Sequence, residues 1–413
     1  MKTTQRTTVL GAVDLHSMAR MRIIIVLLTV IALAMTGCDD GNGGGGNDNG
    51  DNNTAHVHDW GNWETTARTC TTAGGEIRTC KLDPTHTETR NEVAIDPTAH
   101  GYGNWTENQS AGVETRICSY DNTHTEIRPK IAMVLVGGGT FQLGKQLGSL
   151  AGQTGYADVT PVSNVTLTSF YMGKYEVTQA QWQAVMGTTI EELQAAASTS
   201  TANRTWGDAY PVYYVNWYHA IMFCNKLSIM EGLTPAYRIS NSTNPDDWGT
   251  VPTSSNSTWN AVEVVSDSTG YRLPTEAQWE YAAKGGDPTA AGWVGYTFAG
   301  SDTVGDVAWY SGNSGDNGGT ANIRTHEVGT KAPNGLGIYD MSGNVLEWCW
   351  DRYGNYTSED KTDPTGPSSG SGRRMRSGGY KISAGGVTST YRDSYDPHNR
   401  VNDYGFRLAR PAN

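Results

Sequence analysis

The chain has 413 residues, a formal net charge of −12 and 17% charged residues, together with 50 Gly, 13 Trp and 21 Tyr. A chain of this length can form about two or three folding units and bury a sizeable core. The acidic balance argues against nucleic acid as a partner, because phosphate binding needs clustered Lys and Arg. The low charge content and the many glycines and aromatics favour loop-rich structure over a helical bundle.

Residues 1–37 are predicted to be a lipoprotein signal peptide. A basic Arg-Met-Arg segment precedes an apolar run from 23 to 35, which is too short to cross a bilayer comfortably as a helix. Small residues lead into Cys38, as in a bacterial lipobox. Lipidation of Cys38 would anchor the exported protein to a bacterial membrane, at the cell surface on the outer membrane. An ordinary signal peptide followed by a stray cysteine is the alternative.

A tether and a repeated unit follow the predicted anchor. Residues 38–54 are rich in Gly, Asn and Asp, a composition typical of a flexible linker. Residues 55–130 contain two copies of one unit, His58 to Arg90 and His100 to Arg128, in which Thr, Glu, Ile and Arg alternate around turn residues. This pattern predicts short β-hairpins. We interpret the repeats as a stalk that holds the main domain off the membrane.

Each copy carries a cysteine with a histidine six residues later: Cys80 with His86, and Cys118 with His124. Thiolate and imidazole are the usual ligands of zinc, so a zinc site shared between the copies is one interpretation. The interpretation without metal is favoured, because there is no tight CxxC pair and export exposes thiols to oxidation. The cysteines are also too few and too scattered for a disulfide framework.

Residues 131–413 are predicted to form one α+β domain with few helices and much irregular chain. Strands are expected at 133–136 and 140–144, and a further one begins at 170. Helices are expected after Thr178, Asn216 and Thr275, which are good N-cap residues. In the second of these helices, Cys224 lies on the apolar face and is interpreted as a core thiol rather than a nucleophile.

Long motifs in this domain resemble the formylglycine-generating enzyme (sulfatase-modifying factor) family. They include YMGKYEVTQAQW from Tyr171, GYRLPTEAQWEYAA from Gly270, PNGLGIYDMSGNVLEW from Pro333 and GFRL from Gly405. The resemblance spans roughly residues 131 to 410. It implies a C-type-lectin-like fold with a small twisted sheet, flanking helices and long loops. Tryptophans inside the motifs are interpreted as scaffold rather than as sugar platforms.

The resemblance does not extend to the chemistry of the family. Its oxidising members use two cysteines shortly after a terminal Gly-Gly, where the thiolates bind copper. Counted from Gly378-Gly379, those places are Ser383 and Thr388 in this chain. A hydroxyl cannot replace a soft copper-binding thiolate or form a disulfide. We therefore expect no copper and no catalysis of this kind; an oxidoreductase with an unconventional site is the alternative.

Calcium is the cofactor that the resemblance suggests. Family members often bind it in the loop that matches residues 339–348, which implies Asp340 and Glu347 as side-chain ligands and the carbonyls of Gly343 and Val345. Carboxylates and carbonyls from one tight loop suit a hard cation. The alternative is that these acids hydrogen-bond the loop without a metal.

The C-terminal stretch, residues 378–410, combines two kinds of position. Frame positions such as Gly378-Gly379 and Gly405 match the family. Between them lie residues that each have a codon reachable from the asparagine codon AAC by changing adenines alone: Ile382, Ser383, Gly385, Gly386, Asp393, Ser394, Tyr395, Asp396, His398, Asn399, Val401, Asn402 and Asp403. The pattern resembles the target proteins of diversity-generating retroelements, in which adenine errors enter the 3′ end of a gene. A polar loop of an inert family member is the alternative.

The sequence thus predicts a lipid-anchored protein without catalysis, whose C-terminal face binds an unknown external protein or cell-surface ligand. Tyr395, His398 and the Asp and Asn residues would supply amphipathic area and adaptable hydrogen bonds, as antibody loops do. A structural envelope lipoprotein is the further alternative.

Overall fold

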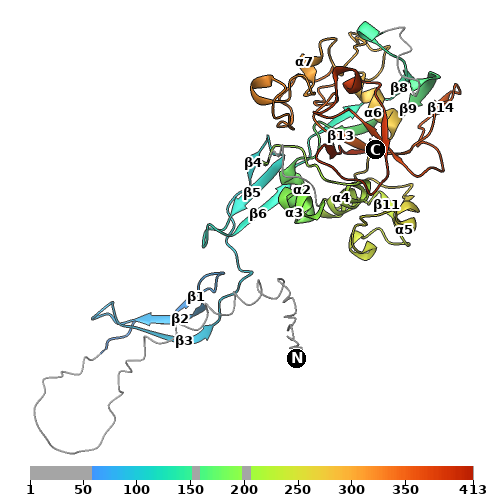
Figure 1. Ribbon diagram of the computed structural model, residues 1–413. Coiled ribbons are helices and arrows are strands. Elements are labelled where there is room, and N and C mark those ends of the chain that lie inside the picture. Colours follow the sequence, from blue (N-terminus) through green and yellow to red (C-terminus); the bar gives the residue numbers. More distant parts are fainter. Residues whose placement is uncertain (1–57, 151–158, 198–205, 413) are drawn as a thin grey trace, which may run out of the picture. The chain divides into compact units, whose positions relative to one another are not determined.

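The computed structural model describes residues 58–150, 159–197 and 206–412 (Figure 1). The predicted signal peptide, the tether and Cys38 lie outside these residues. The described chain divides into two compact units: residues 58–61 with 79–86, and residues 62–78 with the chain from 87 onward. In the described ranges, no helix combines the length and the apolar character needed to cross a membrane.

Each copy of the repeated unit forms a three-stranded sheet, as the hairpin prediction requires. The strands of the first copy are β1 (Glu64–Thr66), β2 (Gly74–Thr79) and β3 (Thr87–Val93). Those of the second copy are β4 (Thr106–Asn108), β5 (Val113–Ile117) and β6 (Thr125–Pro129). In the second copy, the guanidinium groups of Arg116 and Arg128 lie over the ring of Trp105 in cation–π contacts.

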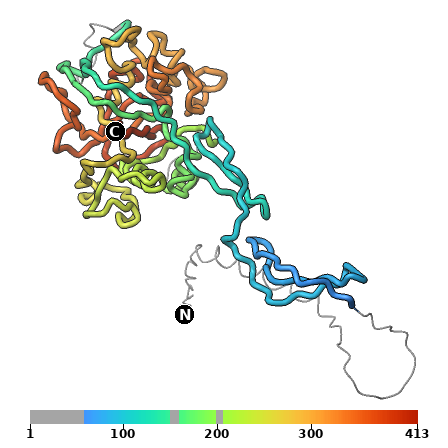
Figure 2. Tube along the Cα trace, turned by 180° about the vertical axis from the view of Figure 1, so that it is seen from behind, coloured from blue at the N-terminus to red at the C-terminus, as the bar shows by residue number. Residues whose placement is uncertain are grey.

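The family-like domain consists of small sheets joined by long loops. In one sheet, the middle strand β10 (Phe170–Gly173) pairs with both β7 (Met133–Val136) and β18 (Ala409–Pro411). β7 and β18 lie at the start and the end of the domain. A second sheet contains β8 (Gly139–Leu143), β9 (Ser163–Leu167) and β14 (Lys361–Thr362). The C-terminal residues lie among segments from much earlier in the domain, as Figure 2 shows in red against green and yellow.

A four-stranded sheet carries the C-terminal stretch. Its order is β16–β15–β13–β17, with β13 (Leu346–Arg352), β15 (Arg373–Arg376), β16 (Asp393–Tyr395) and β17 (Tyr404–Gly405). β13 pairs antiparallel with β15 and parallel with β17, so the predicted variable segment leaves and re-enters one sheet. A two-stranded sheet of β11 (Tyr237–Arg238) and β12 (Glu263–Val264) completes the set.

The three predicted helices begin at the predicted residues. They are α2 (Gln179–Met186), α4 (Trp217–Met230) and α6 (Glu276–Ala283), with Thr178, Asn216 and Thr275 as N-caps. Each cap side chain accepts the N–H of the third helical residue, and that residue's side chain accepts the N–H of the cap, which is a capping box. The helices α3 (Ile190–Ala197), α5 (Ser257–Asn260) and α7 (Val304–Val307) were not predicted from the sequence.

The core confirms the scaffold interpretation of the tryptophans. Four of them are almost completely buried and donate an indole N–H within the domain: Trp182, Trp217, Trp279 and Trp348. Trp309 is half-buried and stacks on His326 with 3.7 Å between the ring centroids. Cys224 is fully buried in α4, and burial raises the pKa of its thiol, which confirms it as a core residue.

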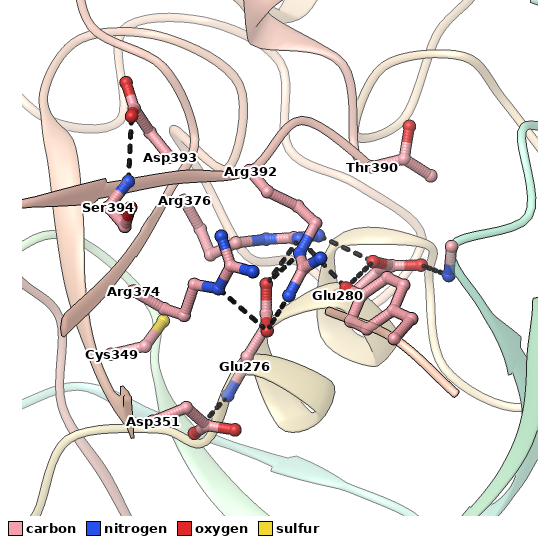
Figure 3. A network of polar contacts seen from close by, with 12 residues as sticks. Glu276, Glu280, Cys349, Asp351, Arg374, Arg376, Thr390, Arg392, Asp393 and Ser394 are labelled. Atoms are coloured by element: carbon pink, nitrogen blue, oxygen red, sulfur yellow. Dashed lines mark hydrogen bonds and ion pairs between the residues drawn. The ribbon is translucent and has the colours of Figure 1, made fainter. Parts of the chain in front are cut away.

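A buried network of charges joins α6 to β15 and to the C-terminal stretch (Figure 3). Arg392 donates to both carboxylate oxygens of Glu276, from Nε at 2.6 Å and from Nη2 at 2.8 Å. One turn later, Glu280 accepts from Nη2 of Arg376 at 2.7 Å. The same nitrogen of Arg376 donates to the carbonyl of Ser389 at 2.9 Å. The network therefore holds the segment between β15 and β16 at both of its ends.

The surrounding cations keep Glu276 ionised. Burial alone would raise the pKa of this carboxyl, but the positive charges of Arg392, Arg374 and Arg376 lower it to about 2. Asp351 accepts the backbone N–H of Glu276 at 2.8 Å. Burial and the nearby charge of Glu276 raise the pKa of Asp351 to about 7.

We expect Arg392→Ala to lower the free energy of unfolding by about 3–5 kcal/mol, because it leaves Glu276 buried without its bidentate partner. Chemical denaturation monitored by tryptophan fluorescence measures this change. Arg324→Ala is the matched control, since the ion pair of Arg324 with Asp316 lies at the surface and contributes at most about 1 kcal/mol. Equal losses in the two variants would contradict the account.

The contribution of Glu276 to the free energy of unfolding is expected to depend on pH. Its folded pKa of about 2 lies below the ordinary value of 4.5, so its stabilisation is fully present above about pH 4.5 and is lost as pH falls toward 2. Asp351 acts in the opposite direction. Because its pKa is raised from 3.8 to about 7 in the folded protein, its contribution to stability is present at low pH and is lost as pH rises toward 7. The difference in unfolding free energy between wild type and Glu276→Gln should therefore shrink from pH 5 to pH 2. A difference that stays constant over this range would show that Glu276 is not held as an ion.

Candidate binding face and the neighbouring loop acids

The C-terminal stretch begins with a backbone conformation that requires glycine. Gly378 has a φ of 67°, and a Cβ at this position would lie 2.1 Å from the carbonyl oxygen of Gly386. An L side chain is disfavoured by the φ and has no space. The chain then passes through a short 3-10 turn, η5 (Ala384–Val387), before it enters β16.

Several frame residues of the stretch are buried and hydrogen-bonded to other segments of the domain. Val387, Thr388, Ser389 and Thr390 are all buried. The N–H of Ser389 donates to the carbonyl of Thr297 at 3.1 Å, and Oγ1 of Thr390 donates to Oε1 of Gln146 at 2.8 Å. Further along, the carbonyl of Pro397 accepts the N–H of Trp217 at 3.0 Å. These contacts tie the frame to the segments that contain Gln146, Trp217 and Thr297.

Most of the predicted variable residues, unlike these frame residues, are at least partly accessible to solvent. The exposed or half-buried ones are Ile382, Ser383, Gly385, Asp393, Ser394, Tyr395, Asp396, His398, Asn399, Val401 and Asn402. Gly386 and Asp403 are buried, so the prediction of one exposed face was wrong for these two positions. Asp403 is 4% exposed and lies 3.2 Å from Nζ of Lys381, while a Cβ on Gly386 would meet the side chain of Ile382.

The exposed part of the stretch presents aromatic rings beside polar groups. The hydroxyls of Tyr391 and Tyr395 each lie 3.2 Å from Oδ2 of Asp393. The ring of Tyr395 packs 4.8 Å from that of Tyr404, and burial raises the pKa of Tyr395, so its hydroxyl stays protonated. Nδ1 of His398 is shielded from water and has no hydrogen-bond partner among the described residues. The set offers both stacking area and hydrogen-bonding groups to a ligand.

The two positions that would carry family cysteines differ in their surroundings. Ser383 is exposed at the start of η5, whereas Thr388 is fully buried with its Oγ1 3.4 Å from that of Thr390. The cysteines within the family-like domain, Cys224 and Cys349, are completely buried, and burial raises the pKa of both thiols. Within its described residues, this domain therefore offers no accessible thiol to copper or to a substrate cysteine.

The loop acids predicted as calcium ligands are engaged with protein groups. Both carboxylate oxygens of Glu347 accept from Arg407, at 2.6 and 2.7 Å, and Oε2 also accepts from Nε1 of Trp279 at 2.6 Å. Oδ2 of Asp340 accepts the N–H of Gly329 at 2.7 Å. Burial raises the pKa of Asp340 to about 6.

This arrangement does not fit the predicted calcium ligands. Glu347 is already neutralised by a fully buried guanidinium, and the carbonyl of Gly343 accepts from Oγ of Ser377 at 3.0 Å. A further acid, Glu176, accepts from Nδ2 of Asn344 at 2.7 Å and from the N–H of Val345 at 3.1 Å. Sequence reasoning missed Glu176, although it lies inside the YMGKYEVT motif. The hydrogen-bonded alternative fits this geometry, and calcium binding by this loop stays a prediction.

Comparison with known proteins places the domain. The family described as "Sulfatase-modifying factor enzyme 1-like domain" matches residues 120–412. The "Chaperone protein LppX" of Paenibacillus barcinonensis is 36% identical over 289 residues, which are 67% of this chain and 89% of that protein. The formylglycine-generating enzyme of Streptomyces coelicolor is 34% identical over 170 residues, and the match covers 37% of this chain and about half (51%) of the enzyme.

Solved structures agree with the assignment. The structure titled "Treponema denticola variable protein 1" is 36% identical with a TM-score of 0.56, and the match covers 68% of this chain and 95% of that one. The structure of CarF is 30% identical with a TM-score of 0.50, and the match covers 68% of this chain and 99% of that one. The predicted α+β, C-type-lectin-like fold is thereby confirmed. This chain belongs to the family of sulfatase-modifying factor enzyme 1-like domains.

Proposed function

We propose that this protein binds an external ligand through the exposed part of its C-terminal stretch and does not catalyse formylglycine formation. In this proposal Cys38 carries a lipid that anchors the chain to a bacterial membrane, with the family domain displayed at the cell surface. The repeats and the tether serve as a spacer between the anchor and the domain. The ligand is a protein or another cell-surface molecule.

The interleaving of buried and exposed positions in one short stretch carries the proposal. Frame residues such as Val387, Thr390 and Arg392 are buried, while nearly all residues with a codon reachable from AAC are exposed or half-buried. Substitutions at accessible side chains usually change stability by less than about 0.5 kcal/mol, whereas buried ones cost far more. Such a surface can change its binding specificity without losing its fold. Its 36% identity to a protein titled a variable protein supports the same interpretation.

The position of the predicted variable residues outside three cavities of the domain favours a macromolecular ligand. Cavities of about 450, 590 and 500 Å³ occur in the domain, and none of the predicted variable residues lines them. Small molecules bind mainly in concave pockets, whereas protein surfaces are recognised by flatter patches with aromatic anchors. Tyr395 and His398 are the side chains of this stretch that best suit the role of anchors.

Chaperone activity is a second candidate, because the relative from Paenibacillus barcinonensis that matches over most of its length bears that name. A chaperone would bind unfolded clients rather than one folded ligand. Refolding yields of a denatured enzyme with and without this protein separate the two candidates. If the C-terminal face binds a folded ligand, the yields should be the same.

Tyr395→Ala with His398→Ala is expected to weaken ligand binding at least about tenfold, because buried aromatic anchors carry most of the energy of an interface. The wild-type domain is first screened against arrays of extracellular proteins and surface glycans, and the affinity of the best binder is measured by calorimetry. Ser358→Ala, at an exposed position on another loop, is the control and should leave the affinity unchanged. A binder whose affinity is unaffected by the double variant would contradict the assignment of the face.

No oxidation of a sulfatase-motif peptide is expected when the protein is incubated with it, copper and oxygen. The reason is that Ser383 and Thr388 replace both thiols and that Cys224 and Cys349 are buried. Mass spectrometry of the peptide cysteine provides the measurement. Conversion to formylglycine would refute the non-catalytic proposal and favour an unconventional active site.

A further inference from the structure

The turn between β5 and β6 brings Cys118 and His124 of the second repeat together. The N–H of Cys118 donates to the carbonyl of His124 at 2.9 Å, and the N–H of His124 donates to that of Asp121 at 3.1 Å. The N–H of Tyr120 donates to Sγ of Cys118 at 3.4 Å, which is the contact that stabilises a thiolate in a tight turn. The turn thus points one sulfur and one imidazole to the same side.

Two further groups reach the same point from outside the turn. Cys70 lies in the loop between β1 and β2, and its N–H donates to the carbonyl of Ala99 at 3.1 Å, next to His100. Cys70 and Cys118 are buried, with their sulfurs 3.7 Å apart, and the rings of His100 and His124 are 4.8 Å apart. The ligand atoms of Cys70, His100, Cys118 and His124 all lie within 4.8 Å of one another.

The distances match a tetrahedral metal centre. A zinc ion with Zn–S bonds of about 2.3 Å and tetrahedral angles holds two thiolate sulfurs about 3.8 Å apart. A disulfide would need about 2.05 Å. The observed 3.7 Å therefore corresponds to the edge of a zinc tetrahedron. Two thiolates and two imidazoles are also a ligand set typical of structural zinc.

The histidines supply an independent indication. Nδ1 of His100 and Nδ1 of His124 are shielded from water and have no hydrogen-bond partner in the described structure. On the other side of the His124 ring, Nε2 lies 3.7 Å from the carboxylate of Asp121. A zinc-bound histidine usually turns its second nitrogen to a carboxylate in this way, which orients the ring and fixes its tautomer. The buried Nδ1 atoms thus lack the partner that a metal would provide.

We propose that Cys70, His100, Cys118 and His124 form a structural zinc site that joins the loop of the first repeat to the second repeat. Binding of Zn²⁺ by the two thiols releases their protons and leaves two thiolates on the ion. The second repeat has a very small apolar cluster, formed by Ala111 and Val113 with Ala180 of α2. A metal centre can replace the missing core in such a small module. The site takes Cys118 and His124 from the pairs noted in the sequence, but Cys70 and His100 stand in place of Cys80 and His86.

The test uses the full chain, purified without reductant or chelator, and two measurements. Elemental analysis is expected to find zinc. In parallel, Cys70 and Cys118 should resist alkylation by iodoacetamide until a strong chelator is added, as read by peptide mass spectrometry. Immediate alkylation, or protection that only a reductant removes, would overturn the proposal, since the first indicates free thiols and the second a disulfide.

Matched cysteine variants assign the site. Cys118→Ser is expected to lower the zinc content by one ion per chain and to make Cys70 reactive. Cys80→Ser changes the equivalent cysteine of the first repeat and should leave Cys70 and Cys118 protected. The far-ultraviolet circular dichroism and the thermal transition of the family domain check that both variants fold. Unchanged zinc content in Cys118→Ser would contradict the assignment.

Discussion

The ion pairs between α6 and the C-terminal part of the domain are the interaction on which the proposed binding face depends. Glu276 and Glu280 lie one helical turn apart, so their carboxylates reach Arg392 and Arg376 from the same side of α6. Buried charges are tolerated only when they are paired and hydrogen-bonded, and removal of one partner is far more costly than removal of a surface pair. The network therefore fixes the path of the buried frame residues between which the predicted variable residues lie.

This constraint separates the two tasks of the C-terminal stretch. Stability comes from the buried frame, which contacts α6, β15 and the loops around Thr297 and Gln146. In the proposed function, recognition is left to side chains such as Asp396 and His398, which are exposed or half-buried. The resemblance to the family implies that the same stretch carries copper-binding cysteines in oxidising members. Ser383 and Thr388 take those places here, while the buried frame of the family is kept.

Local features of the structure were predictable from the sequence. Thr178 and Thr275, each followed by Gln at the third helical position, predicted capping boxes because such bonds span only a few residues. Non-local features were not. Arg392 and Glu276 are 116 residues apart, and Arg407 lies 60 residues from Glu347, whose carboxylate it occupies. The prediction of Glu347 as a calcium ligand considered only its own loop and had no means of including this cation.

The repeats show the same limit. Alternating residues predicted their hairpins, and Cys118 and His124 are close in the sequence, but Cys70 joins these residues only through the path of a loop in the preceding copy. Buried positions inside the variable stretch were missed for a similar reason, because codon patterns carry no information on burial. Asp403 and Gly386 are covered by Lys381 and Ile382, respectively, both of which lie nearby in the folded chain.

The most direct test of the central claim is the free energy of unfolding of a variant in which Ser394, Asp396 and His398 are all replaced by Asn, the residue encoded by AAC. If the buried frame alone holds the stretch, the triple variant should unfold within about 1 kcal/mol of wild type in chemical denaturation, since these are accessible side chains. Both proteins are measured at the same concentration and pH. A loss approaching the roughly 3–5 kcal/mol expected for a broken buried ion pair would contradict the separation of frame and surface.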